Sequence, residues 1–222
     1  LGAMCLALFM VMLDNTVVNV ALPSIQSDLD TSISGLEWIV NGYTLSFAVL
    51  LAVGGRMGDI FGRRRMFVFG VIVFTVASTT AGFAPSNFAL VASRVLQGIG
   101  AAFMMPGTLS IITDAFPPSE RGKAIGTWAG VSALALAIGP VLGGFLTDYV
   151  SWRAIFYINL PVGVLAVLAA TFVVRESRDT TVGRKVDVLG VAILTVGLTA
   201  LVLALIEGNN WGWGSLAVLG LI

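Results

Sequence analysis

Histidine is absent from the sequence, and cysteine occurs once, as Cys5, among 222 residues. Without histidine and with one thiol, the usual ligand sets for zinc, haem and iron–sulfur clusters cannot be assembled, and a Ser-His or Cys-His nucleophile pair is excluded. A single cysteine also excludes a disulfide within the chain. We therefore expect no metal and no cofactor, and the sequence argues against an enzyme.

Charged residues are scarce as well. Only 11% of the residues are charged and 57% are hydrophobic, and the mean hydropathy is +0.97. A soluble domain of this length cannot hide so much apolar surface, so the composition predicts an integral membrane protein. The formal net charge is zero, which argues against nucleic acid as a partner. Because the sequence starts at Leu1 rather than Met and stops within an apolar stretch at Ile222, we expect it to be part of a longer protein.

Long apolar runs predict an all-α membrane protein with seven spanning helices and the beginning of an eighth. Each run is close to or above the ~20 residues that a helix needs to cross a bilayer, and far longer than the ~10 residues of a barrel strand. The predicted spans are 6–23, 38–57, 66–84, 88–113, 124–146, 154–174 and 188–206, with 215–222 as the partial eighth.

Basic residues predict the orientation of the chain in a cell membrane. Ten of the twelve Lys and Arg residues fall on one side of the predicted spans, and the loops on the other side, 24–37, 85–87 and 147–153, contain only Arg153. By the positive-inside rule the basic side is cytoplasmic, which makes the N-terminus cytoplasmic. The ten residues are Arg56, Arg63, Arg64, Arg65, Arg121, Lys123, Arg175, Arg178, Arg184 and Lys185, and an aromatic belt of Trp38, Trp152, Trp211 and Trp213 marks the opposite side.

One carboxylate, Asp14, lies inside the first predicted span. An ionised carboxylate in the bilayer costs several kcal/mol or more unless it faces water, finds a partner or takes up a proton. The low dielectric favours its neutral form, so we interpret Asp14 as a site that loads and releases protons or a cation. Asn15 and Asn19 lie within ~140° of Asp14 on the helix and give it a polar side. The alternative is a buried aspartate that serves packing alone.

The fourth predicted span contains a basic residue, Arg94, at a similar depth. Arg94 lies ~10 Å and Asp14 ~14 Å below the outer surface at ~1.5 Å per residue, and these are the only charges well inside the predicted spans. We predict that they line one cavity and are electrostatically coupled; the alternative is a static ion pair that only joins two helices. Gln97, one turn after Arg94, could fix the guanidinium. The cavity-lining candidates are Asn15, Asn19, Asn41 and Gln97.

Weak internal symmetry relates the first three spans to the next three. Gly54 and Gly55 precede Asp59 at one end of the second span, and Gly143 and Gly144 precede Asp148 at the same spacing at the opposite end of the fifth. Likewise, Pro23 is predicted to close the first span near the outside and Pro106 to break the fourth toward the inside. The pattern predicts two inverted three-helix repeats, as in many secondary transporters.

Two small-residue motifs are candidates for moving parts. In the loop after the second span, Gly55 and Gly62 allow close helix contact, Asp59 can face a positive helix end, and Arg63 and Arg64 offer forked donors to carboxylates. This pattern indicates a gating latch; the alternative is a basic loop that only sets orientation. In the fifth span, a smooth face with a proline indicates a hinge and seal, or else ordinary packing; its residues are Ala135, Gly139, Pro140, Gly143 and Gly144.

Several of these motifs carry a family resemblance. The segment 55–65 (GRMGDIFGRRR) resembles the loop signature of the major facilitator superfamily, with Met57 where that signature usually has Leu. Segments 90–102 and 135–144 resemble the family's fourth-span motif and its antiporter motif, the latter with Ala135 in place of a glycine. Segment 13–23 (LDNTVVNVALP) is similar to the first-helix signature of fourteen-helix drug:proton antiporters, and 156–163 (FYINLPVG) fits their sixth helix.

The resemblance implies an organisation and a function. Residues 1–174 would form the N-terminal six-helix bundle, 175–187 a cytoplasmic loop, and 188–222 a linker helix and the start of the next, without the C-terminal bundle. The expected protein is a monomer that exports lipophilic, cationic small molecules by alternating access, with the proton gradient as its energy source. The alternative is a proton-coupled exporter or symporter of one metabolite. The sequence leaves open an importer and a channel as further rivals.

Overall fold

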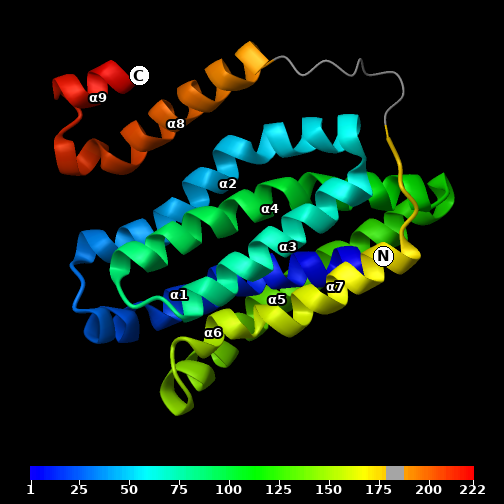
Figure 1. Cartoon of the computed structure of the whole chain (residues 1–222), viewed down its shortest axis with the longest axis horizontal. Helices are drawn as coiled ribbons and strands as arrows, with labels where there is room; N and C mark the ends of the chain where they lie inside the picture. Colours follow the sequence, from blue (N-terminus) through cyan, green and yellow to red (C-terminus); the bar gives the residue numbers. More distant parts are fainter. Residues whose placement is uncertain (179–187) are drawn as a thin grey trace.

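The computed structural model of the chain describes residues 1–178 and 188–222, and the regular structure in these residues is helical (Figure 1). The helices are α1 (Gly2–Leu29), α2 (Ile33–Phe61), α3 (Arg63–Gly82), α4 (Asn87–Ala115), α5 (Pro118–Tyr149), α6 (Ala154–Tyr157), α7 (Asn159–Val173), α8 (Val188–Trp211) and α9 (Leu216–Leu221). With α6 and α7 counted as one span, seven are long and apolar enough to cross a membrane. The predicted all-α membrane fold is confirmed. Arg184 and Lys185, which are predicted to lie on the cytoplasmic side, are outside the described residues.

Helix boundaries follow from local chemistry. Ser32 and Ser86 cap α2 and α4, because their hydroxyls accept hydrogen bonds from the backbone N–H of Gly35 at 3.1 Å and of Ala89 at 3.3 Å. Helix α5 begins with Pro118, whose missing N–H costs nothing in a first turn. Gly62 alone joins α2 to α3, with a φ of 115° that side-chain-bearing residues rarely adopt.

At three prolines the observed helices differ from the helices that the sequence predicts. Pro23 and Pro106 were predicted to end or break helices, and both predictions are wrong, because each proline lies within one continuous helix. A proline removes one hydrogen bond, and a packed bundle can absorb that loss. The predicted single span 154–174 is instead divided at Ile158. Pro161 explains the division, since it has no N–H to donate to the carbonyl of Tyr157.

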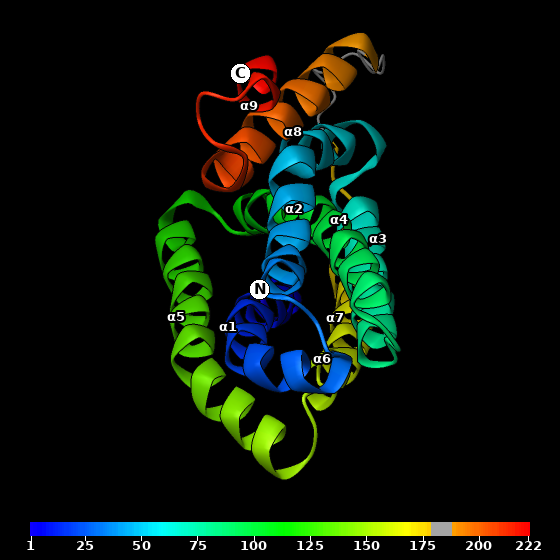
Figure 2. The same cartoon turned by 90° about the vertical axis from the view of Figure 1, so that its left-hand side faces the viewer.

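The packing of the first seven helices has an internal symmetry. Helices α2 and α3 pack closely on α4, and α5 and α7 pack on α1 in the corresponding way. Exchanging the spans α1, α2 and α3 with α4, α5 and α6–α7 therefore reproduces the set of neighbours. Figure 2 shows α1 beside α5 on one side and α4 beside α3 on the other. Corresponding helices of the two predicted three-helix repeats thus have corresponding neighbours.

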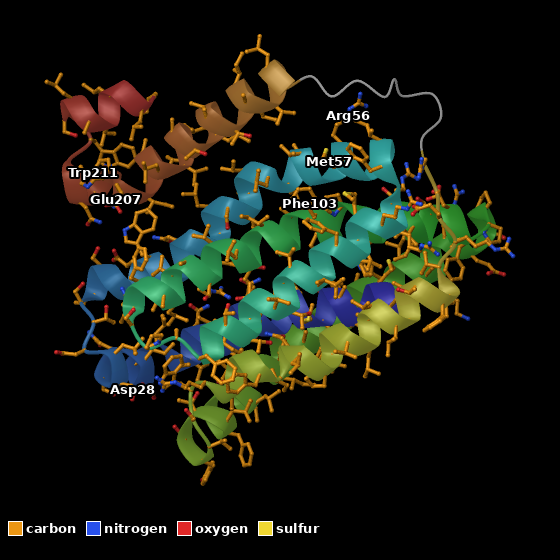
Figure 3. The ribbon with its side chains drawn as sticks, viewed as in Figure 1. Asp28, Arg56, Met57, Phe103, Glu207 and Trp211 are labelled. Carbon is orange, nitrogen blue, oxygen red and sulfur yellow. The ribbon has the colours of Figure 1, made fainter. Side chains whose placement is uncertain are left out.

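Helix α8 lies along the outer side of α2, and α9 packs on α8 (Figures 1 and 2). Few of the side chains of α8 are buried, which suits a helix that faces lipid. The view with side chains separates the two ends of the molecule: Asp28 and Trp211 lie at one end, and Arg56 lies toward the other (Figure 3).

Candidate functional site

A buried ion pair joins α1 to α4. Nη1 of Arg94 lies 2.5 Å from Oδ2 of Asp14, and the two side chains are 1% and 0% exposed. Leu13, Val17 and Val18 around Asp14 are buried apolar residues of the same helix. Because an isolated charge in such surroundings is costly, each member of the pair stabilises the other in its ionised form. The structure therefore brings together the two intramembrane charges that the sequence pairs by depth.

Two amide side chains complete the surroundings of the carboxylate. Nε2 of Gln97 donates to Oδ1 of Asp14 at 2.7 Å, while Oε1 of Gln97 accepts from Nη1 of Arg94 at 2.7 Å. Nδ2 of Asn159, at the start of α7, donates to the same Oδ1 at 3.3 Å. In the described parts of the chain, the groups that bond to the Asp14 carboxylate are the N–H groups of Arg94, Gln97 and Asn159, and none of them can accept a proton from it. The shell therefore suits the ionised form of Asp14.

Helix α2 holds the other side of the guanidinium. Nε of Arg94 donates to the backbone carbonyl of Ile39 at 3.1 Å, and the Tyr43 ring centroid lies 4.3 Å from the guanidinium carbon. The contact is a cation–π interaction. It depends on the close approach of α2 and α4, since a Cβ added at Gly98 would meet the Tyr43 carbonyl and the Ser46 hydroxyl. Four spans thus meet at this site, through α1, α2, α4 and α7.

The predicted cavity-lining residues do not lie together. Asn15 and Asn19 bend back onto their own helix, where their Nδ2 atoms donate to the carbonyls of Val11 at 3.0 Å and of Asn15 at 2.7 Å. Asn19 is exposed and Asn41 is half-buried, whereas Gln97 is fully buried. In this structure Asp14, Arg94 and Gln97 form a closed network rather than the wall of a cavity. Their part in transport stays a prediction.

A buried carboxylate, Glu207, lies just beyond the predicted end of the seventh span. Helix α8 extends to Trp211, beyond the predicted end at 206, and therefore includes Glu207 (Figure 3). The Glu207 carboxylate is 6% exposed and accepts a hydrogen bond from Nδ2 of Asn210 at 3.0 Å.

The predicted gating loop forms a charged cluster at one end of the bundle. Arg63 bonds to Oδ1 of Asp59 through Nε and Nη2, each at 3.2 Å, and its Nη1 lies 2.5 Å from Oδ2 of Asp114 at the end of α4. Gly55 faces Pro106 at ordinary contact distance. A small cavity of ≈ 70 Å³ lies between α2 and α4 beside Asp59 and Arg63. The cluster ties the α2–α3 junction to α4.

Glu176 also belongs to this cluster, and the sequence reasoning missed it. Oε1 of Glu176 accepts from the backbone N–H of Arg64 at 3.1 Å, and Oε2 lies 3.6 Å from Nε of Arg65. The Arg64 side chain donates to the carbonyl of Val174 at 3.1 Å. Glu176 thus places negative charge at the positive N-terminus of α3. Its position among basic residues at 175–178 is the only signal that the sequence offers.

The opposite end has its own polar cluster around Asp28. Oδ2 of Asp28 accepts from Nε1 of Trp152 at 3.1 Å and from Nη1 of Arg153 at 2.7 Å. The Arg153 guanidinium also stacks on the Trp152 ring, 4.3 Å from its centroid, and reaches the carbonyl of Ala84 at 3.5 Å. The cluster joins α1 to the α3–α4 and α5–α6 connections.

The predicted hinge residues of α5 divide into two groups. Ala135, Gly139 and Gly143 are buried, and a Cβ added at Gly139 would overlap Thr16 of α1. Pro140 is exposed, and Gly144 has open space where a Cβ would be. The smooth face of α5 therefore packs on α1 of the same bundle, while Pro140 faces away from it. A hinge or seal at Pro140 and Gly144 stays a prediction.

Comparison with known proteins identifies relatives along nearly the whole chain. The chain is 41% identical over 220 residues to the tetracenomycin C resistance and export protein of Streptomyces glaucescens, which covers 99% of the chain and 41% of that protein. It is 41% identical over 211 residues to the multidrug resistance protein Stp of Mycobacterium tuberculosis, covering 95% and 39%. It is 37% identical over 219 residues to the multidrug transporter protein MdtP of Bacillus subtilis, covering 97% and 40%. The chain spans about two fifths of the length of these relatives.

Solved structures share the fold at low sequence identity. A crystal structure of the peptide transporter POT superposes with a TM-score of 0.67 at 16% identity, covering 97% of the chain and 48% of that structure. The xylose transporter XylE from E. coli, in its inward-open conformation, gives a TM-score of 0.66 at 16% identity, covering 96% and 56%. The family model described as Major Facilitator Superfamily matches residues 4–222. The chain, a multi-pass membrane protein, therefore belongs to the Major Facilitator Superfamily.

Proposed function

We propose that this chain is the N-terminal part of a proton-driven exporter that moves lipophilic small molecules across the cell membrane by alternating access. The observation that carries the proposal is the Asp14–Arg94 pair, fully buried in an apolar bundle and shared by four spans. A proton on Asp14 would leave the positive charge of Arg94 without its partner. Protonation would therefore change how α1 is held against α4.

Exchange follows if proton and substrate compete for the same state. A substrate bound from the cytoplasmic side would be displaced as Asp14 takes up a proton from outside, and loss of that proton inside would reset the site. Moving one charge through 100 mV supplies ~2.3 kcal/mol, which is enough to bias such a cycle. Neither step needs a nucleotide or a metal, so the proton gradient is the proposed energy source.

The proposed substrates are lipophilic, with cations favoured because the site holds a carboxylate. The relatives named for multidrug resistance and multidrug transport support this class. A second candidate is export of one specific metabolite, and the relatives named for tetracenomycin C export and for actinorhodin transport in Streptomyces favour it. A panel of unrelated dyes separates the two, since a dedicated exporter should move few of them.

We propose a cytoplasmic N-terminus and a monomer. The Asp59–Arg63–Asp114 cluster would then lie at the cytoplasmic end, together with Gly55, Gly62 and Arg64. Its bonds link α2, α3 and α4, and would act as a latch that opens when the cytoplasmic side opens. Labelling single cysteines introduced at 31 and at 120 from each side of sealed vesicles tests the orientation.

The decisive test is exchange in proteoliposomes that contain the full-length protein carrying this chain, with ethidium as the lipophilic cation. An imposed pH gradient should drive ethidium movement against its concentration gradient. Asp14→Asn should abolish this gradient-driven movement, while Asp30→Asn, an equal change of charge at an exposed position with φ 45° that suits Asn, should leave it intact. Coupling that survives in Asp14→Asn would place the proton site elsewhere.

A further inference from the structure

Asn159 links the Asp14 carboxylate to α3 and to the break between α6 and α7. Its Nδ2 atom lies 3.3 Å from Oδ1 of Asp14 and 2.9 Å from Oγ of Ser78. The Ser78 hydroxyl in turn donates to the backbone carbonyl of Phe156 at 2.9 Å. Asn159 is 1% exposed, and Ser78 and Phe156 are each 0% exposed. A chain of hydrogen bonds thus runs from the carboxylate to the carbonyl that lies two residues before Ile158.

The chemistry of this chain is sensitive to protonation. An ionised carboxylate only accepts hydrogen bonds, whereas a protonated carboxyl also donates one. With a proton on Oδ1 of Asp14, the N–H of Asn159 would face another donor. Among the bonds that Asp14 accepts, the one from Asn159 is the longest, at 3.3 Å against 2.5 Å from Arg94 and 2.7 Å from Gln97. The Asn159 bond is therefore the one that rearranges most easily.

We propose that the Asn159 amide turns over when Asp14 is protonated, and so transmits the protonation state of α1 to the α6–α7 break. In the ionised state, Nδ2 donates to Asp14 and to Ser78. After a half-turn of the amide, its oxygen accepts from the new O–H of Asp14, and the Ser78 hydroxyl turns from Phe156 to the same oxygen. The inference rests on the proposed proton coupling at Asp14.

The consequence falls on a weak point of the fold. The Phe156 carbonyl loses its hydroxyl donor in the rearranged state. The next carbonyl, that of Tyr157, already lacks a helical donor because residue 161 is proline. Two successive carbonyls beside Ile158 would then lack these donors, which favours a change of angle between α6 and α7. Asn159 is therefore a positioning residue that converts a proton into a helix movement.

Asp14 is the group at this site whose charge changes. Arg94 of α4 faces it and stays charged, and Tyr43 of α2 stacks on Arg94. Helix α7 has no charged residue, and Tyr157 of α6 packs on Phe83. Helix α5, which also packs on α1, has its ionisable side chains exposed near its two ends, at Glu120, Arg121, Lys123, Asp148 and Tyr149.

Infrared difference spectra between acidic and alkaline pH test the inference on the full-length protein in liposomes. Asp14→Asn assigns the carboxyl band of Asp14, and ¹³C-carbonyl phenylalanine with Phe156→Leu assigns the backbone carbonyl of Phe156. We expect both bands to change at the same pH in the wild type. In Ser78→Ala and in Asn159→Leu, the Asp14 band should still titrate while the Phe156 band stays constant.

The serine variant also has a predicted shift. Ser78→Ala removes two hydrogen bonds from the ionised arrangement, to Asn159 and to Phe156, but only one from the neutral arrangement. The midpoint of the Asp14 band should therefore rise by about half to one pH unit, a change of about 3- to 10-fold in proton affinity. Ser93→Ala is the matched control, since Ser93 is a buried hydroxyl that bonds to Thr80 and Ala89 instead.

The outcomes separate the inference from the proposed function. A wild-type Phe156 band that ignores pH while the Asp14 band titrates overturns the inference and leaves proton coupling in place. Unchanged midpoints in Ser78→Ala would count against it in the same way. If Asp14 shows no titrating band and Asp14→Asn keeps gradient-driven ethidium transport, the proton site lies elsewhere and the inference falls with it. If the wild type shows no gradient-driven ethidium transport, the proposed function itself fails. Should Asn159→Leu not fold, the wild-type and Ser78→Ala spectra still decide.

Discussion

Gly54 of α2 lies directly against the backbone carbonyl of Ala102 in α4, so that a Cβ added at Gly54 would overlap that oxygen. Ala102 is four residues before Pro106, and its carbonyl therefore lacks the usual helical N–H donor. The Cα–H of glycine is a weak donor that can approach such an oxygen. The close contact of α2 with α4 and the continuity of α4 through Pro106 thus depend on the same pair of residues.

Gly54→Ala should lower the stability of the protein. The added methyl group meets backbone rather than a movable side chain, so we expect a cost of about 1–3 kcal/mol from overpacking. Thermal unfolding of the purified protein in detergent measures the change. Gly144→Ala is the control, because a Cβ there meets open space and alanine favours a helix by about 1 kcal/mol. Equal midpoints for the two variants would contradict the close contact.

Removing one member of the buried ion pair should cost more than removing both. Arg94→Leu leaves the Asp14 carboxylate buried without its cation, and we expect a loss of about 3–5 kcal/mol. Adding Asp14→Asn should recover part of that stability, since no unpaired charge then remains. A double-mutant cycle on unfolding free energies measures the coupling. Additive effects of the two substitutions would show that the pair is not coupled in the folded protein.

The junction between α2 and α3 should tolerate no side chain at Gly62. Its φ of 115° is unfavourable for other residues, and a Cβ would lie 2.5 Å from Oε1 of Glu176. We expect Gly62→Ala to destabilise the protein by at least about 1–2 kcal/mol, and Glu176→Gln to leave the strain at this position in place. Thermal unfolding of both single variants and of the double variant checks this. Rescue of Gly62→Ala by Glu176→Ala would mean that the clash, rather than the backbone, dominates.

The cluster at Asp28 should distinguish loss of charge from loss of an acceptor. Asp28→Asn keeps an oxygen for the indole N–H of Trp152, and the ion pair with Arg153 is partly exposed and screened by solvent, so we expect little loss of stability. Asp28→Ala leaves the N–H of a buried tryptophan without its acceptor, at about 1–3 kcal/mol. Unfolding midpoints and tryptophan fluorescence measure the difference. Identical midpoints would argue against the Trp152 bond.

Depth along the predicted helices indicates that Asp14 and Arg94 lie at the same level of the bundle, but it does not indicate which other side chains face them. The seven spans follow from hydropathy, and Asp14 and Arg94 were paired because their depths match, which is a property of the helical rise. Asn159 could not be placed in the same way. Whether it faces Asp14 depends on the rotation of α7 about its axis.

In the charged clusters at the helix ends, the sequence likewise predicts local contacts but not contacts between distant segments. Arg63 and Asp59 are four residues apart, so their contact is local and predictable. Glu176 reaches Arg64 across 112 positions of sequence, and no spacing rule connects them. Pro23 and Pro106 were misread because proline signals a helix end in water more strongly than in a packed membrane bundle. Glu207 was missed because the predicted span stopped one residue before it.

The single-residue connection at Gly62 has a mechanical consequence. One residue connects α2 to α3, so neither helix can move far without the other. Glu176 and Ser177 bind the first residues of α3: Oε1 of Glu176 accepts from the Arg64 N–H, and the Ser177 carbonyl accepts from the Arg63 N–H at 3.0 Å. A tilt of α2 is therefore passed directly to α3 and to the segment that follows α7. Insertion of a few flexible residues after Gly62 would remove this coupling, and α2 and α3 could then tilt independently.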